Sequence, residues 1–150
     1  MIPSKIDVSG VVINRPLEQV FAFVSDLEND PQWTPGAVMR RTSQGPLGVG
    51  TTFQQHDRFI GRRMDLSLEV TDYEPPHRIG LKTTSGPLSF GGTRMFEPVD
   101  DAATRVTFVG DGHAPGVLKL AEPLLAAAGE RRLRAQLGNL KRLLESQVQG

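Results

Sequence analysis

The sequence contains no cysteine. Disulfides, thiol catalysis, cysteine-ligated zinc and cysteine-ligated iron–sulfur clusters are therefore excluded. It also lacks any apolar run near the roughly 18 residues that a membrane-spanning helix needs. Residues 1–7 lack the apolar core of a signal peptide. These absences predict a cytoplasmic protein without a membrane span.

An excess of charge of either sign is absent as well. Lys and Arg number 17, and Asp and Glu also number 17, so the formal net charge is zero. Domains that bind nucleic acid through bulk charge usually carry a basic excess, so no nucleic-acid partner is predicted. The 150 residues suit a single domain spanning residues 1–150. A chain of this length is long enough to bury a substantial core.

The longest helical pattern lies in the last third of the chain. Apolar residues recur there at the i, i+4, i+7 spacing that places side chains on one helix face. They are Leu133, Leu137, Leu140, Leu144 and Val148. The basic run at 131–134 is assigned to the solvent-facing side of this helix, where Glu130 is expected to support Arg134 four residues later.

A second apolar stripe, within 117–128, is also helical in period but out of phase with the first. Pro123 and Gly129 lie where the phase changes. Proline inside a helix removes a backbone hydrogen bond and clashes with the carbonyl four residues before it. The sequence therefore predicts a short helix, a break or kink at 123–129, and a straighter main helix to about Gln147.

The rest of the chain predicts a sheet. A strand at 5–14 is followed by an amphipathic helix at 17–24 and a very short second helix at 29–36. The apolar period then changes to two, and six strands are expected: 38–43, 51–59, a long strand between Gly61 and Pro75, 77–84, 87–97 and 103–111. Hairpin-linked strands with one buried face favour a curved sheet. The predicted fold class is α+β, an antiparallel sheet of about seven strands around the long C-terminal helix.

Six segments, taken in order, carry a resemblance to a known family. They are residues 12–21, 30–35, 48–51, 70–79, 104–108 and 137–145. Together they resemble the START-like, helix-grip superfamily (SRPBCC), in its polyketide cyclase/dehydrase and lipid-transport branch. The resemblance implies a hydrophobic cavity between the sheet and the long helix. Relatives include aromatase/cyclases, lipid carriers, plant hormone receptors and chaperone-associated domains, and the shared motifs contain no catalytic residue that transfers to a position in this chain.

Alternation along the strands predicts polar side chains on the buried face of the sheet. Gln55 and Asp57 share a face with Phe53 and Phe59, Arg94 with Leu88, Phe90 and Phe96, and Arg62 with Met64. A charge on a buried face must be paired or must meet water or a ligand. Two interpretations stay open. One is an internal salt bridge such as Asp57–Arg94, or a strand-end side chain reaching water; the other is a polar anchor inside an apolar ligand pocket.

Two other side chains are candidates for ligand contact. His113 lies in the 110–116 loop before the long helix, where it either reaches a ligand or is an ordinary loop histidine. Trp33, the only tryptophan, is either a core anchor for the short helix or a lid over the pocket mouth. His56 and His77 are expected to face solvent. Because the three histidines lack metal-ligand spacing, no metal or other cofactor is predicted.

The leading hypothesis is that the chain binds a small hydrophobic or aromatic ligand, lipid- or polyketide-like, between sheet and helix. The candidate contacts are Trp33, Phe53, Gln55, Asp57, Arg62, Met64, Phe90, Arg94, His113, Leu133 and Leu137. The alternative is a polyketide cyclase/dehydratase-type enzyme in which Asp57 or His113 moves protons and Arg94 holds an enolate. A third hypothesis is a protein-interaction module whose cavity is vestigial. A homodimer also stays open.

Overall fold

The computed structural model of the chain describes residues 4–59, 61–86, 89–113 and 122–147. The elements follow one another as a strand, two short helices, six strands and a long helix. They are β1 (Ser4–Ile13), α1 (Leu17–Ser25), the 3₁₀ helix η1 (Leu27–Gln32), β2 (Val38–Arg41), β3 (Thr52–Phe59), β4 (Arg62–Glu74), β5 (Arg78–Ser85), β6 (Ser89–Asp100), β7 (Ala103–His113) and α2 (Glu122–Ser146). This is the order that the sequence predicted.

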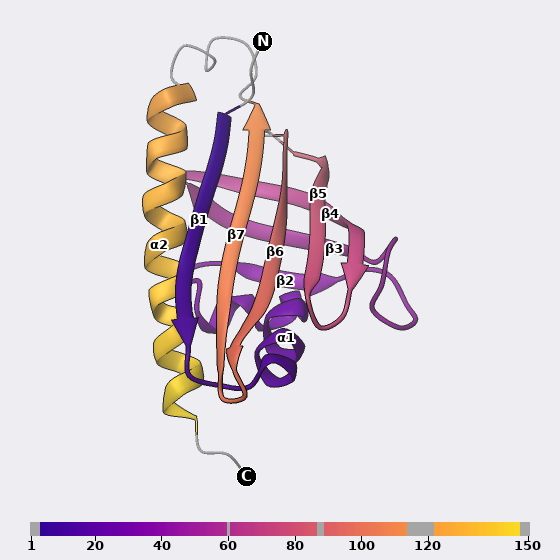
Figure 1. Cartoon of the computed structure of the whole chain (residues 1–150). Coiled ribbons are helices and arrows are strands. Elements are labelled where there is room, and N and C mark those ends of the chain that lie inside the picture. The colour runs from indigo at the N-terminus through magenta and orange to yellow at the C-terminus, as the bar shows by residue number, and fades with distance from the viewer. Residues whose placement is uncertain (1–3, 60, 87–88, 114–121, 148–150) are drawn as a thin grey trace.

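The strands form one seven-stranded sheet in the order β1-β7-β6-β5-β4-β3-β2. Every neighbouring pair is antiparallel. The sheet is strongly curved, since β1 and β7 stand upright in Figure 1 while β3 and β4 run nearly across it. Right-handed strand twist accumulates over a sheet of hairpins, which produces this curvature. The predicted α+β fold is confirmed.

Helix α2 differs from the prediction, because it runs without a break through Gly129. Pro123 is the second residue of the helix. Backbone N–H groups in the first turn have no acceptor within the helix, so proline removes no helical hydrogen bond at this position. Gly129 is tolerated inside the helix at a cost of roughly 1 kcal/mol relative to alanine. The first part of the out-of-phase stripe, residues 117–121, and Val148 lie outside the described residues.

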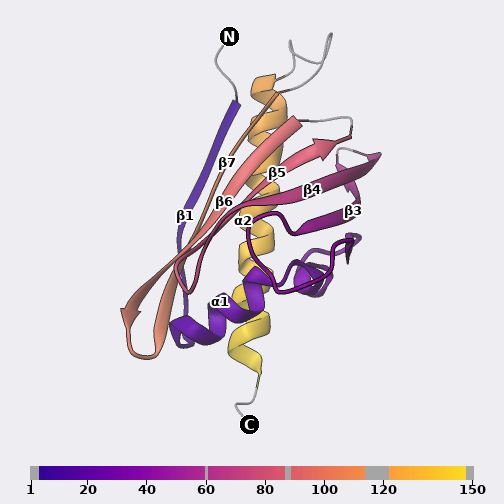
Figure 2. The same cartoon turned by 90° about the vertical axis from the view of Figure 1, so that its right-hand side faces the viewer.

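The apolar core lies between α2, the inward face of the sheet, and the two short helices. Leu137, Leu140 and Leu144 of α2 are buried, as their spacing predicted. They belong to one cluster with residues from every layer, among them Val20, Phe21, Val24, Leu27, Trp33, Phe53, Leu68, Val70, Ile79, Phe96, Val106 and Phe108. In Figure 2, α1 lies across the lower end of the sheet.

The C-terminal end of α2 is held against the end of β1 by polar contacts. The Asn14 amide donates to Glu145 Oε2 at 2.8 Å, and Arg15 Nη2 donates to the Glu145 carbonyl at 2.7 Å. Lys141 Nζ donates to the Val12 carbonyl at 2.6 Å and to Glu145 at 2.7 Å. The hydrogen bond from Lys141, helped by that from Asn14, lowers the pKa of the Glu145 carboxyl. These contacts fix where α2 lies on the sheet.

No helix among the described residues is long and apolar enough to cross a membrane.

Candidate functional site

Asp57 lies on the inward face of β3, opposite Met64 of β4. Only 7% of its surface is exposed, which confirms the burial that the alternation of β3 predicted. Gln55, two residues earlier on the same face, is half-buried opposite Leu66. The inward face of β3 therefore carries polar groups in apolar surroundings.

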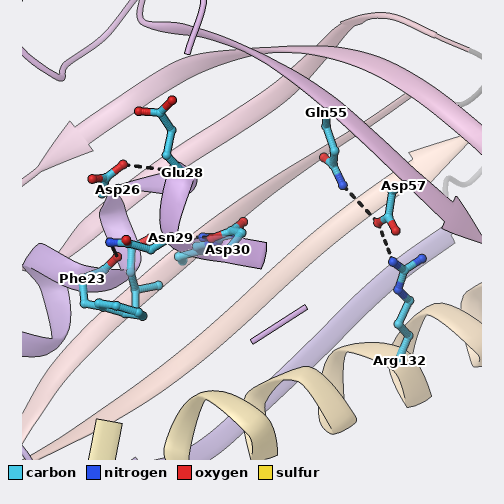
Figure 3. Close-up of polar contacts among 10 residues, drawn as sticks. Phe23, Asp26, Glu28, Asn29, Asp30, Gln55, Asp57 and Arg132 are labelled. Atoms are coloured by element: carbon cyan, nitrogen blue, oxygen red, sulfur yellow. Dashed lines mark hydrogen bonds and ion pairs between the residues drawn. The ribbon is translucent and has the colours of Figure 1, made fainter. Parts of the chain in front are cut away.

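Both oxygens of the Asp57 carboxylate accept hydrogen bonds. Gln55 Nε2 donates to Oδ2 at 3.2 Å, and the Arg58 amide donates to Oδ1 at 2.7 Å. Arg132 of α2 forms a short ion pair with Oδ2 and also donates from Nη1 to the Arg58 carbonyl at 2.6 Å. Figure 3 shows Gln55 and Arg132 converging on Asp57 from the strand and from the helix. This junction fastens α2 to β3.

The assignment of Arg132 to the solvent-facing side of the helix is wrong. Its side chain is 26% exposed and reaches across to the sheet. Arg132 precedes Leu133 at the edge of the apolar stripe, and a long arginine stem can lie along apolar surface while its head finds a partner. The expected helix-surface pair of Glu130 and Arg134 is confirmed, with 2.8 Å between the charged atoms.

Of the two interpretations left open, an internal salt bridge is present for both Asp57 and Arg94, but the pair given as its example is wrong, because Arg94 pairs with Asp30 of η1. Its Nη1 donates to Oδ1 at 3.0 Å and its Nη2 donates to Oδ2 at 2.7 Å. Nη1 also donates to the Val24 carbonyl at 3.1 Å, at the end of α1. Asp30, on η1, is a second acidic residue near Arg94, and the curvature of the sheet brings the two together. Its two carboxylate oxygens form a bidentate pair with the guanidinium, which Asp57 cannot form with Arg94.

Aromatic rings enclose the Arg94 guanidinium. Its central carbon lies 5.3 Å from the centroid of the Trp33 ring and 5.0 Å from that of Phe108. The side chains of Arg94 and Asp30 are only 15% and 7% exposed. Burial raises the pKa of the Asp30 carboxyl, and the charge and hydrogen bonds of Arg94 oppose that shift. A desolvated pair of this kind depends on both partners staying in place.

Local hydrogen bonds position η1, and with it Asp30. The Asp26 side chain accepts a hydrogen bond from the Glu28 amide at 3.1 Å and so caps the helix. Asn29 Nδ2 donates to the Phe23 carbonyl at 3.0 Å (Figure 3). Sequence reasoning missed Asp30 although a signal was present. It lies three residues from both Leu27 and Trp33, and residues at that spacing share one side of a 3₁₀ helix.

The other predicted contacts fall into three groups. Phe53, Leu137 and Trp33 are buried core residues, and Trp33 is thus a core anchor, not a lid. Met64 is buried at 9% exposure, and Leu133 is half-buried against the margin of the core. Arg62 and Phe90, expected on the buried face, are exposed, and they lie at the beginning of β4 and of β6. His113 ends β7, and its side chain lies outside the described residues.

The remaining histidines face solvent. His77 is exposed, and His56 Nδ1 lies 2.6 Å from Asp65 at the surface, where the hydrogen bond lowers the pKa of Asp65. No group of three or more His, Asp or Glu residues among the described parts of the chain could hold a metal ion. A cleft of about 680 Å³ opens between α1 and strands β2, β3 and β4, lined by residues that include Phe21, Arg41, Tyr73 and the predicted contact Phe53. Neither Asp57 nor Arg94 lines it.

The Arg132→Met variant tests the junction between α2 and β3. It keeps most of the apolar stem but leaves the buried Asp57 carboxylate without its cationic partner. We expect the free energy of unfolding to fall by roughly 1–3 kcal/mol, the worth of a hydrogen bond to a charged group. The matched control, Arg131→Met, changes an exposed neighbour and should stay within about 0.5 kcal/mol. Urea denaturation measures both, and equal effects would contradict the junction.

The chain resembles proteins that have been described before. A family model described as polyketide cyclase / dehydrase and lipid transport matches residues 5–145. A search of curated proteins finds no match.

Several solved structures share the fold. The Zhui aromatase/cyclase from Streptomyces sp. R1128 superposes with a TM-score of 0.86 at 15% identity, over 99% of this chain and 98% of that one. The protein TTHA0849 from Thermus thermophilus gives 0.81 at 17% identity, over 95% and 99%. A START superfamily protein from Mycobacterium smegmatis gives 0.77 at 16% identity, over 93% and 98%. At these identities the likeness establishes the helix-grip fold.

Proposed function

Because the chain belongs to the polyketide cyclase/dehydrase and lipid-transport family, we propose that it binds a small hydrophobic or aromatic ligand between the inward face of its sheet and α2. One observation supports the proposal most: the charged groups of Asp57 and Arg94 lie largely buried on an inward face that is mainly apolar. Small-molecule sites are mostly apolar with a few fixed polar groups that orient the ligand. A lipid or a polyketide-like molecule suits such a surface.

The proposal gives each predicted contact a role according to its burial. Half-buried Leu133 and buried Met64 supply apolar contact, and half-buried Gln55 supplies an amide. Phe53, Leu137 and Trp33 support them from within the core. Arg62 and Phe90 are placed at the rim.

Asp57 is better suited to holding α2 against β3 than to proton transfer. Donors from Gln55, Arg58 and Arg132 already occupy both of its oxygens. A general base needs an oxygen within hydrogen-bond reach of the proton that it removes. Binding requires no rearrangement of this network, whereas the cyclase/dehydratase alternative does, so we favour binding.

Titration with the fluorescent apolar probe N-phenyl-1-naphthylamine tests the proposal, together with native mass spectrometry of freshly purified protein. We expect saturable binding with one probe per chain. Leu133→Trp should weaken it at least about ten-fold by filling the site, at a stability cost of about 1–3 kcal/mol. The matched control is Leu124→Trp, at an exposed position of the same helix, which should bind like the parent. Absence of saturable binding, or equal loss in both variants, would overturn the proposal.

A further inference from the structure

Two glycines leave a bare strip of backbone on the inward face of β6 and β7. Gly92 and Gly110 are directly opposite each other across the two strands. Arg94 and Phe108 form the inward-facing cross-strand pair two residues away, so the glycines belong to the same face. Neither glycine has a positive φ, so neither is required by its backbone conformation.

No described side chain covers this strip. A Cβ built on Gly92 would meet only the Val109 carbonyl oxygen at 3.3 Å and Gly110 Cα at 3.8 Å. A Cβ built on Gly110 would meet only the Gly91 carbonyl oxygen at 3.4 Å. Among the described residues, every atom within 4 Å of those positions is therefore backbone of the adjacent strand. A flat, side-chain-free surface allows a planar group to approach the backbone closely.

Arg94, at one end of the strip, keeps two unused donors. A guanidinium has five N–H bonds in a fixed plane. Three of them are used, two from Nη1 to Val24 and Asp30 and one from Nη2 to Asp30. No described residue accepts from the other two, on Nε and Nη2. These two N–H bonds are parallel and lie on the edge of the guanidinium that is turned away from the Asp30 carboxylate.

The charge balance of the Arg94–Asp30 pair determines which kind of ligand oxygen would accept the two remaining N–H bonds. Asp30 already balances the Arg94 charge, and both side chains are largely buried. A carboxylate ligand would add a second negative charge that nothing in the pair compensates, at a desolvation cost. An uncharged carbonyl oxygen accepts both N–H bonds without changing the net charge.

We propose that the strip of Gly92 and Gly110 is the floor of a subsite for a planar, conjugated group of the ligand, and that Arg94 Nε and Nη2 donate to an uncharged carbonyl oxygen on that group. This inference rests on the proposed function and specifies the chemistry of its ligand. A two-residue step along β6 covers about 7 Å. A ring system lying over the glycines therefore ends near the Arg94 side chain.

Isothermal titration of the intact protein with three matched naphthalenes tests the inference. They are 2-acetonaphthone, which carries a ketone, 2-ethylnaphthalene, which has no oxygen, and 2-naphthoate, which is anionic. We expect the ketone to bind at least about ten-fold more tightly than the hydrocarbon, because only the ketone accepts the charge-assisted hydrogen bonds of Arg94. The carboxylate should bind no more tightly than the ketone. This comparison uses the unaltered chain and does not depend on any variant folding.

Two variants locate the effect. Gly110→Leu places a side chain on the strip and should weaken ketone and hydrocarbon alike by at least about ten-fold. Its control is Thr93→Leu, on the outer face of β6, which should bind both like the parent. Arg94→Lys keeps a cation beside Asp30 but lacks the parallel N–H pair, so it should abolish the preference for the ketone over the hydrocarbon, a ratio measured within the same variant.

The outcomes separate this inference from the function on which it rests. If none of the three naphthalenes binds and the fluorescent probe also fails to bind, both are overturned. If the compounds bind but ketone and hydrocarbon bind equally, or the carboxylate binds best, the subsite is wrong and the function stands. Unchanged affinities in Gly110→Leu would likewise overturn the glycine floor alone.

Discussion

The Leu140→Asp variant is expected to unfold the protein, or to lower its free energy of unfolding by about 4 kcal/mol or more. Leu140 is 0% exposed and lies in the core cluster between α2 and the sheet. The substitution removes its apolar contacts and places a carboxylate where no cation has been provided. Urea denaturation followed by circular dichroism measures the loss.

Leu124 offers a matched control for that experiment. It lies on the same helix but is 75% exposed. The same substitution there, Leu124→Asp, should change stability by no more than about 0.5 kcal/mol. A parent-like melting temperature for Leu140→Asp would contradict the packing of α2 against the sheet.

The Arg94→Met variant is expected to lose roughly 3–5 kcal/mol of stability near neutral pH. Methionine keeps part of the side chain's packing between Trp33 and Phe108, so the loss reflects mainly the Asp30 carboxylate left buried without its cation. Adding Asp30→Asn removes that charge, so the double variant should be more stable than Arg94→Met alone. If the double variant is the less stable of the two, the loss comes from packing instead.

The loss of stability in Arg94→Met should also depend on pH. Burial raises the pKa of Asp30 in the folded chain, and without Arg94 nothing offsets that effect. A carboxyl whose pKa is higher folded than unfolded destabilises the fold above its folded pKa, and this penalty disappears as the pH falls and the group becomes protonated. The difference in free energy of unfolding between Arg94→Met and the parent protein should therefore narrow from about pH 7 to about pH 4. A constant difference across that range would rule out Asp30 as its source.

Local pattern was sufficient for most of the fold. The period-two alternation of β4 and the helical spacing of Leu137, Leu140 and Leu144 are properties of short segments, and the structure buries the faces that they predicted. The same reasoning predicted the burial of Asp57. It failed at Pro123, where the position of a proline within a helix, not its presence, decides whether the helix breaks.

The sequence by itself determined which faces are apolar and which charges lie among them, since side-chain direction follows from strand and helix period. Only the tertiary structure decided how those charges pair. Asp57 meets Arg132 across 75 residues of sequence, and Arg94 meets Asp30 across 64. Such partners are selected by the curvature of the sheet and by the placement of η1 and α2 upon it. Periodicity contains no information about the distance between segments of the chain. It therefore suggested a salt bridge between Arg94 and Asp57, because both are charged residues on predicted buried faces.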